Sequence, residues 1–231
     1  MHLIKRNFFI LLFLQFSFTM QAKDTIIYVF DPMCGWCYGF SNVIKQLSSE
    51  YQLEFDFKII SGGMVVGEKE GEIGDFADYI LDAYHIVEKS SGVKFGEPYL
   101  AQLKTKKIHT SSVMPAIAIE VFKTFHPMEA IAFASDVQKA YYFYGLDLRL
   151  DDVYKDLIKP YGIDETAFLT MLHSQEFKQK AFDGFQESSR LGVNGYPAVM
   201  AIHDGKYYSL AKGFADYDQL KSIFEKLKSL K

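Results

Sequence analysis

The amino-acid sequence predicts an α/β fold in which a large helical segment separates two groups of strands. Short apolar runs that are typical of buried strands lie at residues 25–30 and 198–202. Between them, from about residue 72 to residue 191, apolar residues recur with helical spacing. The 231 residues are 49% hydrophobic, which is ample for a buried core. We therefore expect one large domain, or a core with a sub-domain, whose strands come from both ends of the chain.

The N-terminal residues have the pattern of a secretory signal peptide. Lys5 and Arg6 precede an uncharged, apolar stretch over residues 7–20, and Ala22 is a suitable end for cleavage. The stretch is shorter than the roughly 20 residues that a spanning helix needs, with an uncleaved anchor as the alternative. Residues 1–22 are therefore predicted to be a signal peptide and residues 23–231 the folded domain. The predicted location is an oxidising compartment, most simply a bacterial periplasm.

The first predicted strand, residues 25–30, ends at Asp31-Pro32, and a helix begins at or near Cys34. Apolar residues then recur at spacings of three and four, which places them on one helix face: Cys37, Phe40, Ile44 and Leu47. Cys34 therefore lies at the helix N-terminus. Unpaired backbone N–H groups and the positive end of the helix dipole at that position favour a thiolate over a thiol.

Cys34 and Cys37 belong to the tetrad Cys-Gly-Trp-Cys and are the only cysteines in the chain. Thiols in this pattern at a helix N-terminus are more acidic than a free thiol, so Cys34 is predicted to be the catalytic nucleophile. Cys37 lies three residues further along the same helix face. It is near enough to attack a mixed disulfide formed at Cys34, so it is predicted to be the resolving thiol.

Other uses of this cysteine pair are less consistent with the sequence. A zinc or iron–sulfur site would need further soft ligands, but there is no third cysteine and the six histidines are scattered singly. A purely structural disulfide across two intervening residues would close too small a loop to add much stability. The sequence therefore favours a redox-active pair and predicts no metal site.

The region after the first helix contains a second strand and then the helical block. Residues 53–60 alternate apolar and polar, which predicts a strand, and a Ser-Gly-Gly sequence breaks it. Within the block, Ser112 and Pro127 precede apolar runs at the starts of helices. Asp151 and Asp164 are predicted to be the N-caps of two more.

Strand patterns return near the C-terminus. Residues 198–202 and 207–210 flank a turn that contains a glycine, which predicts a β-hairpin. Asp216 and Gln219 then have the spacing of a capping box, so the chain is predicted to end in an amphipathic helix.

This order of elements resembles a thioredoxin-like fold with a large helical insertion, about residues 64–191, as in the DsbA family of secreted disulfide oxidoreductases. The segment Gly-Val-Asn-Gly-Tyr-Pro-Ala at residues 192–198 is similar to that family's Gly-Val-x-Gly-x-Pro segment, which enters the third core strand. The resemblance implies that Pro197 is a cis-proline facing the cysteine pair and part of the catalytic site. It also implies that Tyr196, together with Gly195, binds an extended substrate through the backbone.

The two residues between the cysteines differ from those of the best-known oxidases in the family, which have Pro-His where this chain has Gly-Trp. Without an imidazole to stabilise the thiolate, Cys34 is expected to be less acidic and its disulfide less oxidising. The Asp-Pro pair before the cysteines and the tryptophan between them resemble the corresponding residues of a sub-group described as protein-disulfide isomerases. Trp36 offers an aromatic substrate-binding surface next to Cys34, or else packs the helix start.

We therefore expect an exported thiol–disulfide oxidoreductase that exchanges disulfides with cysteine-containing client proteins. Whether it oxidises or isomerises the disulfides of its clients stays open. An unknown redox partner is expected to return its dithiol to the starting redox state. No organic cofactor is implied, since the dithiol itself carries two electrons. A net charge of −4 without a basic patch argues against a nucleic-acid partner. Two alternatives stay open: a Cu(I)-handling thioredoxin-fold module, and a glutathione-dependent small-molecule isomerase or transferase, whose relatives carry serine in place of Cys34.

Overall fold

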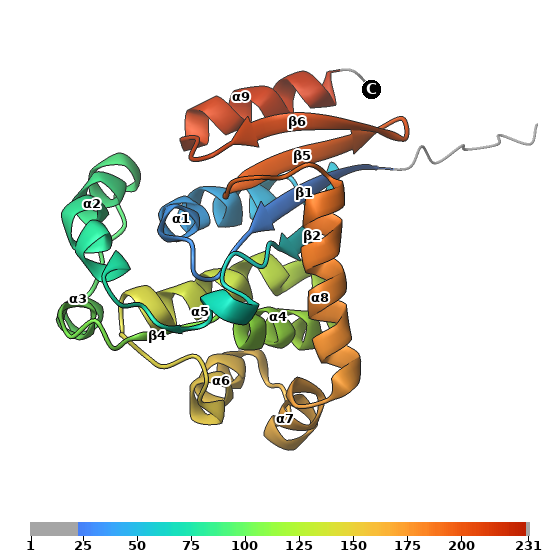
Figure 1. The fold of residues 1–231 in the computed structure, drawn as a ribbon. Helices are drawn as coiled ribbons and strands as arrows, with labels where there is room; N and C mark the ends of the chain where they lie inside the picture. Colours follow the sequence, from blue (N-terminus) through green and yellow to red (C-terminus); the bar gives the residue numbers. More distant parts are fainter. Residues whose placement is uncertain (1–22, 230–231) are drawn as a thin grey trace, which may run out of the picture.

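The computed structural model describes residues 23–229, and its centre is a four-stranded mixed sheet with the order β2-β1-β5-β6 (Figure 1). β1 (Asp24–Phe30) lies inside the sheet, parallel to β2 (Phe55–Ser61) and antiparallel to β5 (Ala198–His203). β6 (Lys206–Lys212) forms the outer edge as the second strand of a hairpin with β5. The predicted α/β fold, with strands from both ends of the chain, is confirmed.

Alternation along β1 gives the sheet two buried faces. Ile26, Tyr28 and Phe30 point to one face, and Ile27 and Val29 point to the other. All five side chains are at most 2% exposed, because the first face belongs to the main core and the second packs against Leu191, Val193 and Tyr196 in the segment before β5. This burial explains why the sequence of β1 is a continuous apolar run without polar alternation.

Helix α1 (Gly35–Glu50) and helix α9 (Tyr217–Lys228) pack together next to the sheet. The apolar residues of α1 that were predicted to face the core are all fully buried: Cys37, Phe40, Ile44 and Leu47. α9 begins with the predicted capping box, in which the Asp216 carboxylate accepts the Gln219 N–H and the Gln219 side chain accepts the Asp216 N–H. Both helices therefore begin where the sequence predicts, and the predicted apolar face of α1 is the buried one.

The helical insertion lies between β2 and β5 in the sequence, and most of its helices lie below the sheet in Figure 1. Its helices are α2 (Phe76–Ser91), α3 (Glu97–Lys104), α4 (Val113–Phe125), α5 (Ala130–Tyr142), α6 (Asp151–Ile158), α7 (Glu165–Leu172) and α8 (Gln175–Arg190). Short 3-10 turns occupy Gly67–Lys69, Pro127–Glu129 and Lys159–Tyr161, and β3 (Gly71–Glu72) pairs with β4 (His109–Thr110). α5 and α2 pack on α1, and α8 packs on β2, so the insertion is joined to the sheet domain on both sides of the chain's first two strands and helix.

Three predicted boundaries can be compared with the structure. Asp164 is the N-cap of α7, as predicted, and accepts the Ala167 N–H at 2.8 Å. Asp151 is not an N-cap, because α6 starts at Asp151 itself and Leu150 takes the capping position. β2 starts at residue 55, later than the predicted 53, because residues 51–54 form a turn at the end of α1.

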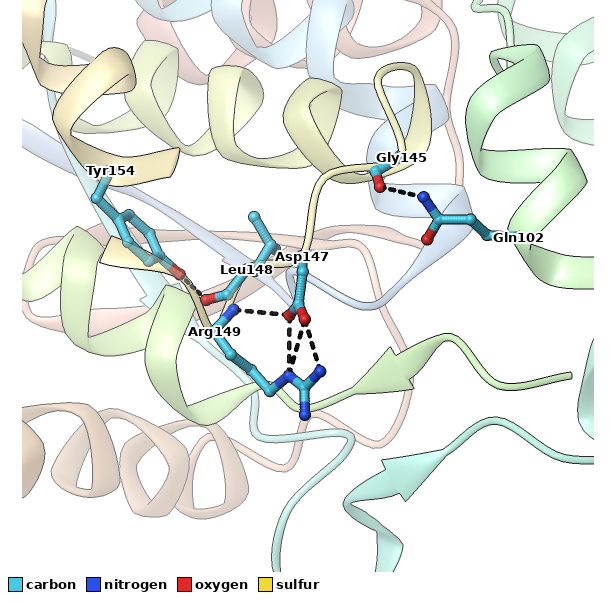
Figure 2. Close-up of polar contacts among 6 residues, drawn as sticks. All are labelled: Gln102, Gly145, Asp147, Leu148, Arg149 and Tyr154. Carbon is cyan, nitrogen blue, oxygen red and sulfur yellow. Dashed lines mark hydrogen bonds and ion pairs between the residues drawn. The ribbon is translucent and has the colours of Figure 1, made fainter. Parts of the chain in front are cut away.

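The loop between α5 and α6 is closed by its own side chains, as Figure 2 shows. Arg149 binds the carboxylate of Asp147 through two guanidinium nitrogens, the closest pair at 2.6 Å. The Tyr154 hydroxyl donates to a backbone carbonyl of the loop at 2.7 Å, and Gln102 on α3 donates to the Gly145 carbonyl at 2.7 Å. The loop therefore ties α3 to the end of α5.

The predicted signal peptide, residues 1–22, lies outside the described residues. Among residues 23–229, each helix is too short or too polar to serve as a membrane span.

Candidate active site

The two cysteines lie at the start of α1 as free thiols in different surroundings. Cys34 is the N-cap of α1 and is 8% exposed, whereas Cys37 is fully buried one turn later. The Cys37 N–H donates to the Cys34 sulfur at 3.3 Å. Burial raises the pKa of the Cys37 thiol well above its ordinary value, and the adjacent Cys34 raises it further. Cys34 is therefore the more exposed of the two thiols, and burial favours the protonated form of Cys37.

The loop before β5 lies against the cysteine pair, although Tyr196 in this loop is 162 residues further along the chain than Cys34. The Tyr196–Pro197 peptide bond is cis, as the family resemblance implies. The Cys34 thiol donates to the Tyr196 carbonyl across 3.5 Å. The Tyr196 hydroxyl donates to the Gly62 carbonyl at 2.9 Å, which fastens this loop to the end of β2. The structure thus brings Cys34, Cys37, Tyr196 and Pro197 together.

Two other residues predicted to bind substrate occupy different positions. Trp36 is half-buried on α1, and its ring lies 5.8 Å from the ring of Phe214 in the loop before α9. It packs against the helix start and also leaves part of its ring accessible. Gly195 lines a cavity of about 320 Å³ beside the start of β5, and Cys34 is not among the residues of that cavity.

A buried carboxylate beneath the cysteines was not predicted as part of the site. Asp31 is fully buried, and its carboxylate accepts hydrogen bonds from the Met33 N–H at 2.9 Å, the Met64 N–H at 2.7 Å and the Ser112 hydroxyl at 2.7 Å. Burial raises the pKa of Asp31, and the three hydrogen bonds oppose this shift without cancelling it. The Asp31 carbonyl accepts the Cys34 N–H at 3.1 Å. Asp31 therefore holds the backbone that positions Cys34.

Asp31 also joins the cysteine loop to the insertion through Ser112. The Ser112 hydroxyl donates to Asp31 and accepts the Val65 N–H at 3.0 Å, while the Ser112 N–H donates to the Val65 carbonyl at 2.8 Å. Ser112 precedes α4, as predicted. Because its hydroxyl is bonded to Asp31 and Val65, its side chain makes no capping hydrogen bond. The sequence signal for Asp31 was only an aspartate before a proline, which equally marks an ordinary turn at the end of a strand.

The fold and the paired cysteines define a class of protein, and the comparison with protein families agrees. The sequence profile described as Thioredoxin matches residues 28–222. Because this match covers most of the chain, the protein belongs to the thioredoxin family. The predicted thioredoxin-like fold with a helical insertion is therefore confirmed.

Solved structures with the same fold include disulfide oxidoreductases. A candidate protein disulfide isomerase from Nitrosomonas europaea has a TM-score of 0.77 at 24% identity, covering 90% of this chain and 99% of that one. The cytosolic disulfide reductase DsbM from Pseudomonas aeruginosa has a TM-score of 0.75 at 22% identity, covering 90% and 100%. Reduced DsbA1 from Neisseria meningitidis has a TM-score of 0.54 at 16% identity, covering 91% and 88%. These structures confirm that the chain has the fold of the DsbA-like proteins that its sequence resembles.

A curated relative is the ClpXP adapter protein SpxH from Shouchella clausii, 23% identical over 187 residues. The match covers 80% of this chain but only 60% of the relative, so the chain spans less than two thirds of the protein it matches. The predicted periplasmic location is contradicted by these relatives, since DsbM is a cytosolic reductase and SpxH is an adapter of ClpXP. That prediction, which depended on residues 1–22, is therefore wrong.

Proposed function

We propose that this protein is a thiol–disulfide oxidoreductase that exchanges disulfides with cysteines of client proteins. The observation that carries the proposal is the placement of Cys34, at a helix N-terminus, 3.5 Å from the Tyr196 carbonyl and above the buried Cys37. An accessible sulfur, a second sulfur one turn away and a backbone acceptor beside the first are the groups that two-step exchange needs.

In the first step the Cys34 thiolate attacks a client disulfide. A bond forms between Cys34 and one client sulfur, the client S–S bond breaks, and the second client sulfur leaves as a thiolate with the electron pair. Cys37 then loses its proton and attacks Cys34. The Cys34–Cys37 disulfide forms and the client leaves with two reduced thiols, so two electrons have passed from the protein to the client.

The loop of Tyr196 and Pro197 supplies the binding surface in this proposal. When the Cys34 thiol is consumed in a mixed disulfide, it no longer donates to the Tyr196 carbonyl, and a backbone N–H of the client can take its place. Trp36 offers the exposed part of its ring to the client. Gly195 contributes only through the backbone of the same loop, because it has no side chain.

We propose that the protein works mainly as a reductase or isomerase. Gly-Trp between the cysteines provides no imidazole to stabilise a Cys34 thiolate, so the reduced form is less favoured than in strong oxidases. A low-molecular-weight thiol of the glutathione class is then the proposed source of electrons. The structure of DsbM with GSH, at a TM-score of 0.72, supports this choice of thiol.

The test is the reduction of insulin by dithiothreitol, followed as turbidity, with the full-length protein and its Cys34→Ser variant. We expect the wild-type protein to accelerate precipitation and the variant to have no effect, because serine cannot form the mixed disulfide. Undiminished acceleration by Cys34→Ser would remove Cys34 from the mechanism. Iodoacetamide labelling of both proteins, detected by mass, checks that Cys34 is reactive in the folded wild type.

A further inference from the structure

An apolar cavity of about 250 Å³ lies against Cys34 on the side of the helical insertion. α2 forms one wall with Phe76, Ala83 and Tyr84, and the ring of Phe95, after the end of α2, continues the lining 5.8 Å from the ring of Tyr84. Cys34 itself is part of the lining. The cavity therefore lies next to Cys34, and Tyr196 and Pro197, in the loop proposed to pair with client backbone, contribute none of its lining.

The lining of this cavity is uncharged throughout. It consists of Met33, Cys34, Gly35, Trp36, Met64, Phe76, Tyr79, Ile80, Ala83, Tyr84, Ile86, Val87, Phe95, Tyr99 and Tyr142. A charged or strongly polar group placed here would lose its hydration without gaining a partner of opposite charge. An apolar group would be stabilised by leaving water.

Helix α2 also exposes apolar side chains at the mouth of the cavity. Phe76 is 59% exposed, Tyr79 is 63% exposed and Ile86 is 50% exposed. The rings of Phe76 and Tyr79 stack at 5.3 Å, so they form one continuous apolar surface. Exposed apolar clusters of this kind mark binding surfaces more often than isolated exposed residues do.

We propose that this cavity binds one bulky apolar side chain of the client, next to the client cysteine that bonds to Cys34. The proposal rests on the proposed function, since the occupant is part of a client chain. Three observations favour it: Cys34 lines the cavity, the lining is uncharged, and the volume suits one aromatic or large aliphatic side chain.

The geometry of an extended chain limits which client residue reaches the cavity. In the mixed disulfide the client cysteine is fixed at the Cys34 sulfur, and each further residue of an extended chain adds about 3.3 Å. Neighbouring side chains point to opposite sides, so only a residue one or two positions from the client cysteine reaches the cavity. The cavity thus selects clients by the residue that flanks their cysteine.

The experiment measures a preference between two sets of short peptides. Each peptide carries one cysteine in a disulfide with mercaptoethanol, and the flanking residues on either side of this cysteine are varied between Phe and Ala. The reduced full-length protein is mixed with each peptide, and release of the peptide thiol is followed by mass spectrometry. We expect the better Phe peptide to react at least about tenfold faster than its Ala counterpart, as one hydrophobic pocket can provide.

Substitutions in α2 test whether the cavity causes the faster reaction of the Phe peptides. Ala83→Phe fills the cavity from its wall and is expected to bring the ratio of the two rates close to one. Phe76→Ala removes an exposed part of the wall and should lower the ratio if Ala83→Phe does not fold. His85→Phe adds the same ring on the exposed side of α2, outside the lining, and should keep the wild-type ratio.

Two results would overturn the proposal: equal rates for Phe and Ala peptides in the wild-type protein, or a preference that survives both Ala83→Phe and Phe76→Ala. Self-association that Phe76→Ala abolishes, without a peptide preference, would assign the surface to a second copy of the chain instead. Failure of the proposed function looks different, because neither peptide would then react although Cys34 is still labelled by iodoacetamide.

Discussion

The two sides of Cys34 are built from different parts of the fold and have opposite chemistry. On the side of the sheet, the Tyr196 carbonyl faces the sulfur at 3.5 Å, and the Tyr196 hydroxyl is bonded to Gly62. On the side of the insertion, α2 presents an uncharged cavity and exposed aromatic rings. A backbone carbonyl interacts with any extended chain, whereas an apolar cavity interacts with particular side chains. In the proposed mechanism the sheet side therefore supplies general affinity and the insertion side supplies selectivity.

The largest expected effect comes from substitution of Cys37, which is fully buried in the first turn of α1 after Cys34. Cys37→Ala should lose nearly all turnover with insulin and should accumulate mixed disulfides with client proteins, because no second thiol resolves the bond at Cys34. The complexes are measured on non-reducing gels of cell extracts and disappear on addition of reductant. Cys34→Ser in the same cells is the control and should trap none. Complexes formed in Cys34→Ser but absent from Cys37→Ala would exchange the roles of the two cysteines.

The next effect tests how closely the sheet side is packed. In Gly62→Ala the new methyl would lie 2.1 Å from the Tyr196 ring, so the ring and the loop before β5 must move. We expect the free energy of unfolding to fall by about 3 kcal/mol in urea denaturation, together with weaker insulin reduction. Gly195→Ala is the matched control, because nothing lies within 4 Å of its added methyl. A stability loss in Gly195→Ala as large as in Gly62→Ala would show that this packing is not the cause.

Asp31 connects the two sides, so Asp31→Asn tests whether they depend on one another. The amide cannot accept all three hydrogen bonds, and we expect a loss of about 2 kcal/mol in the free energy of unfolding. Because the pKa of Asp31 is raised in the folded protein, the stability that the wild-type carboxyl contributes is greatest below the unfolded-chain value of about 3.9 and falls as pH rises toward the folded value.

The deficit of Asp31→Asn relative to wild type should therefore be largest near pH 4 and smaller at pH 7. Urea denaturation at both pH values measures it, and Asp56→Asn, at an exposed position on β2, serves as the control. A deficit that grows with pH would mean that hydrogen bonding to the carboxylate outweighs burial.

The smallest expected effect comes from the Tyr196 hydroxyl. Tyr196→Phe removes its hydrogen bond to the Gly62 carbonyl and should lower the free energy of unfolding by about 1 kcal/mol. Insulin reduction should stay close to the wild-type rate, since the backbone carbonyl that faces Cys34 is unchanged. Tyr207→Phe, on the exposed edge strand, should affect neither measurement. A strong loss of activity in Tyr196→Phe would show that the loop needs the hydroxyl for its position.

Much of the sheet domain was predictable because its signals are local. The apolar run of β1, the helix stripe that follows Cys34 and the capping box at Asp216 each depend on residues close together in the sequence. The meeting of Tyr196 with Cys34 was predicted only through the family resemblance, since 162 residues separate them.

The rest of the site depends on tertiary contacts that no local pattern carries. Asp31 was predicted to end a strand, and its role emerges only when Met64 and Ser112 come near it. The cavity combines residues from α1, α2, α3 and α5, none of which is unusual in its own helix. The pairing of β3 with β4 was missed because each strand has only two residues.

The pairing of β1 with β5 has a consequence for how the chain reaches its native state. Thr25 pairs with Ile202, so the inner strand of the sheet has to wait for a partner that is synthesised much later. Contacts of such large sequence separation slow folding, because the loop between them must be closed first. On the ribosome, β1 would emerge with one edge open while the insertion helices were still forming, and an open apolar edge is prone to aggregation. Early docking of β2, the parallel neighbour of β1, would cover the other edge during that interval.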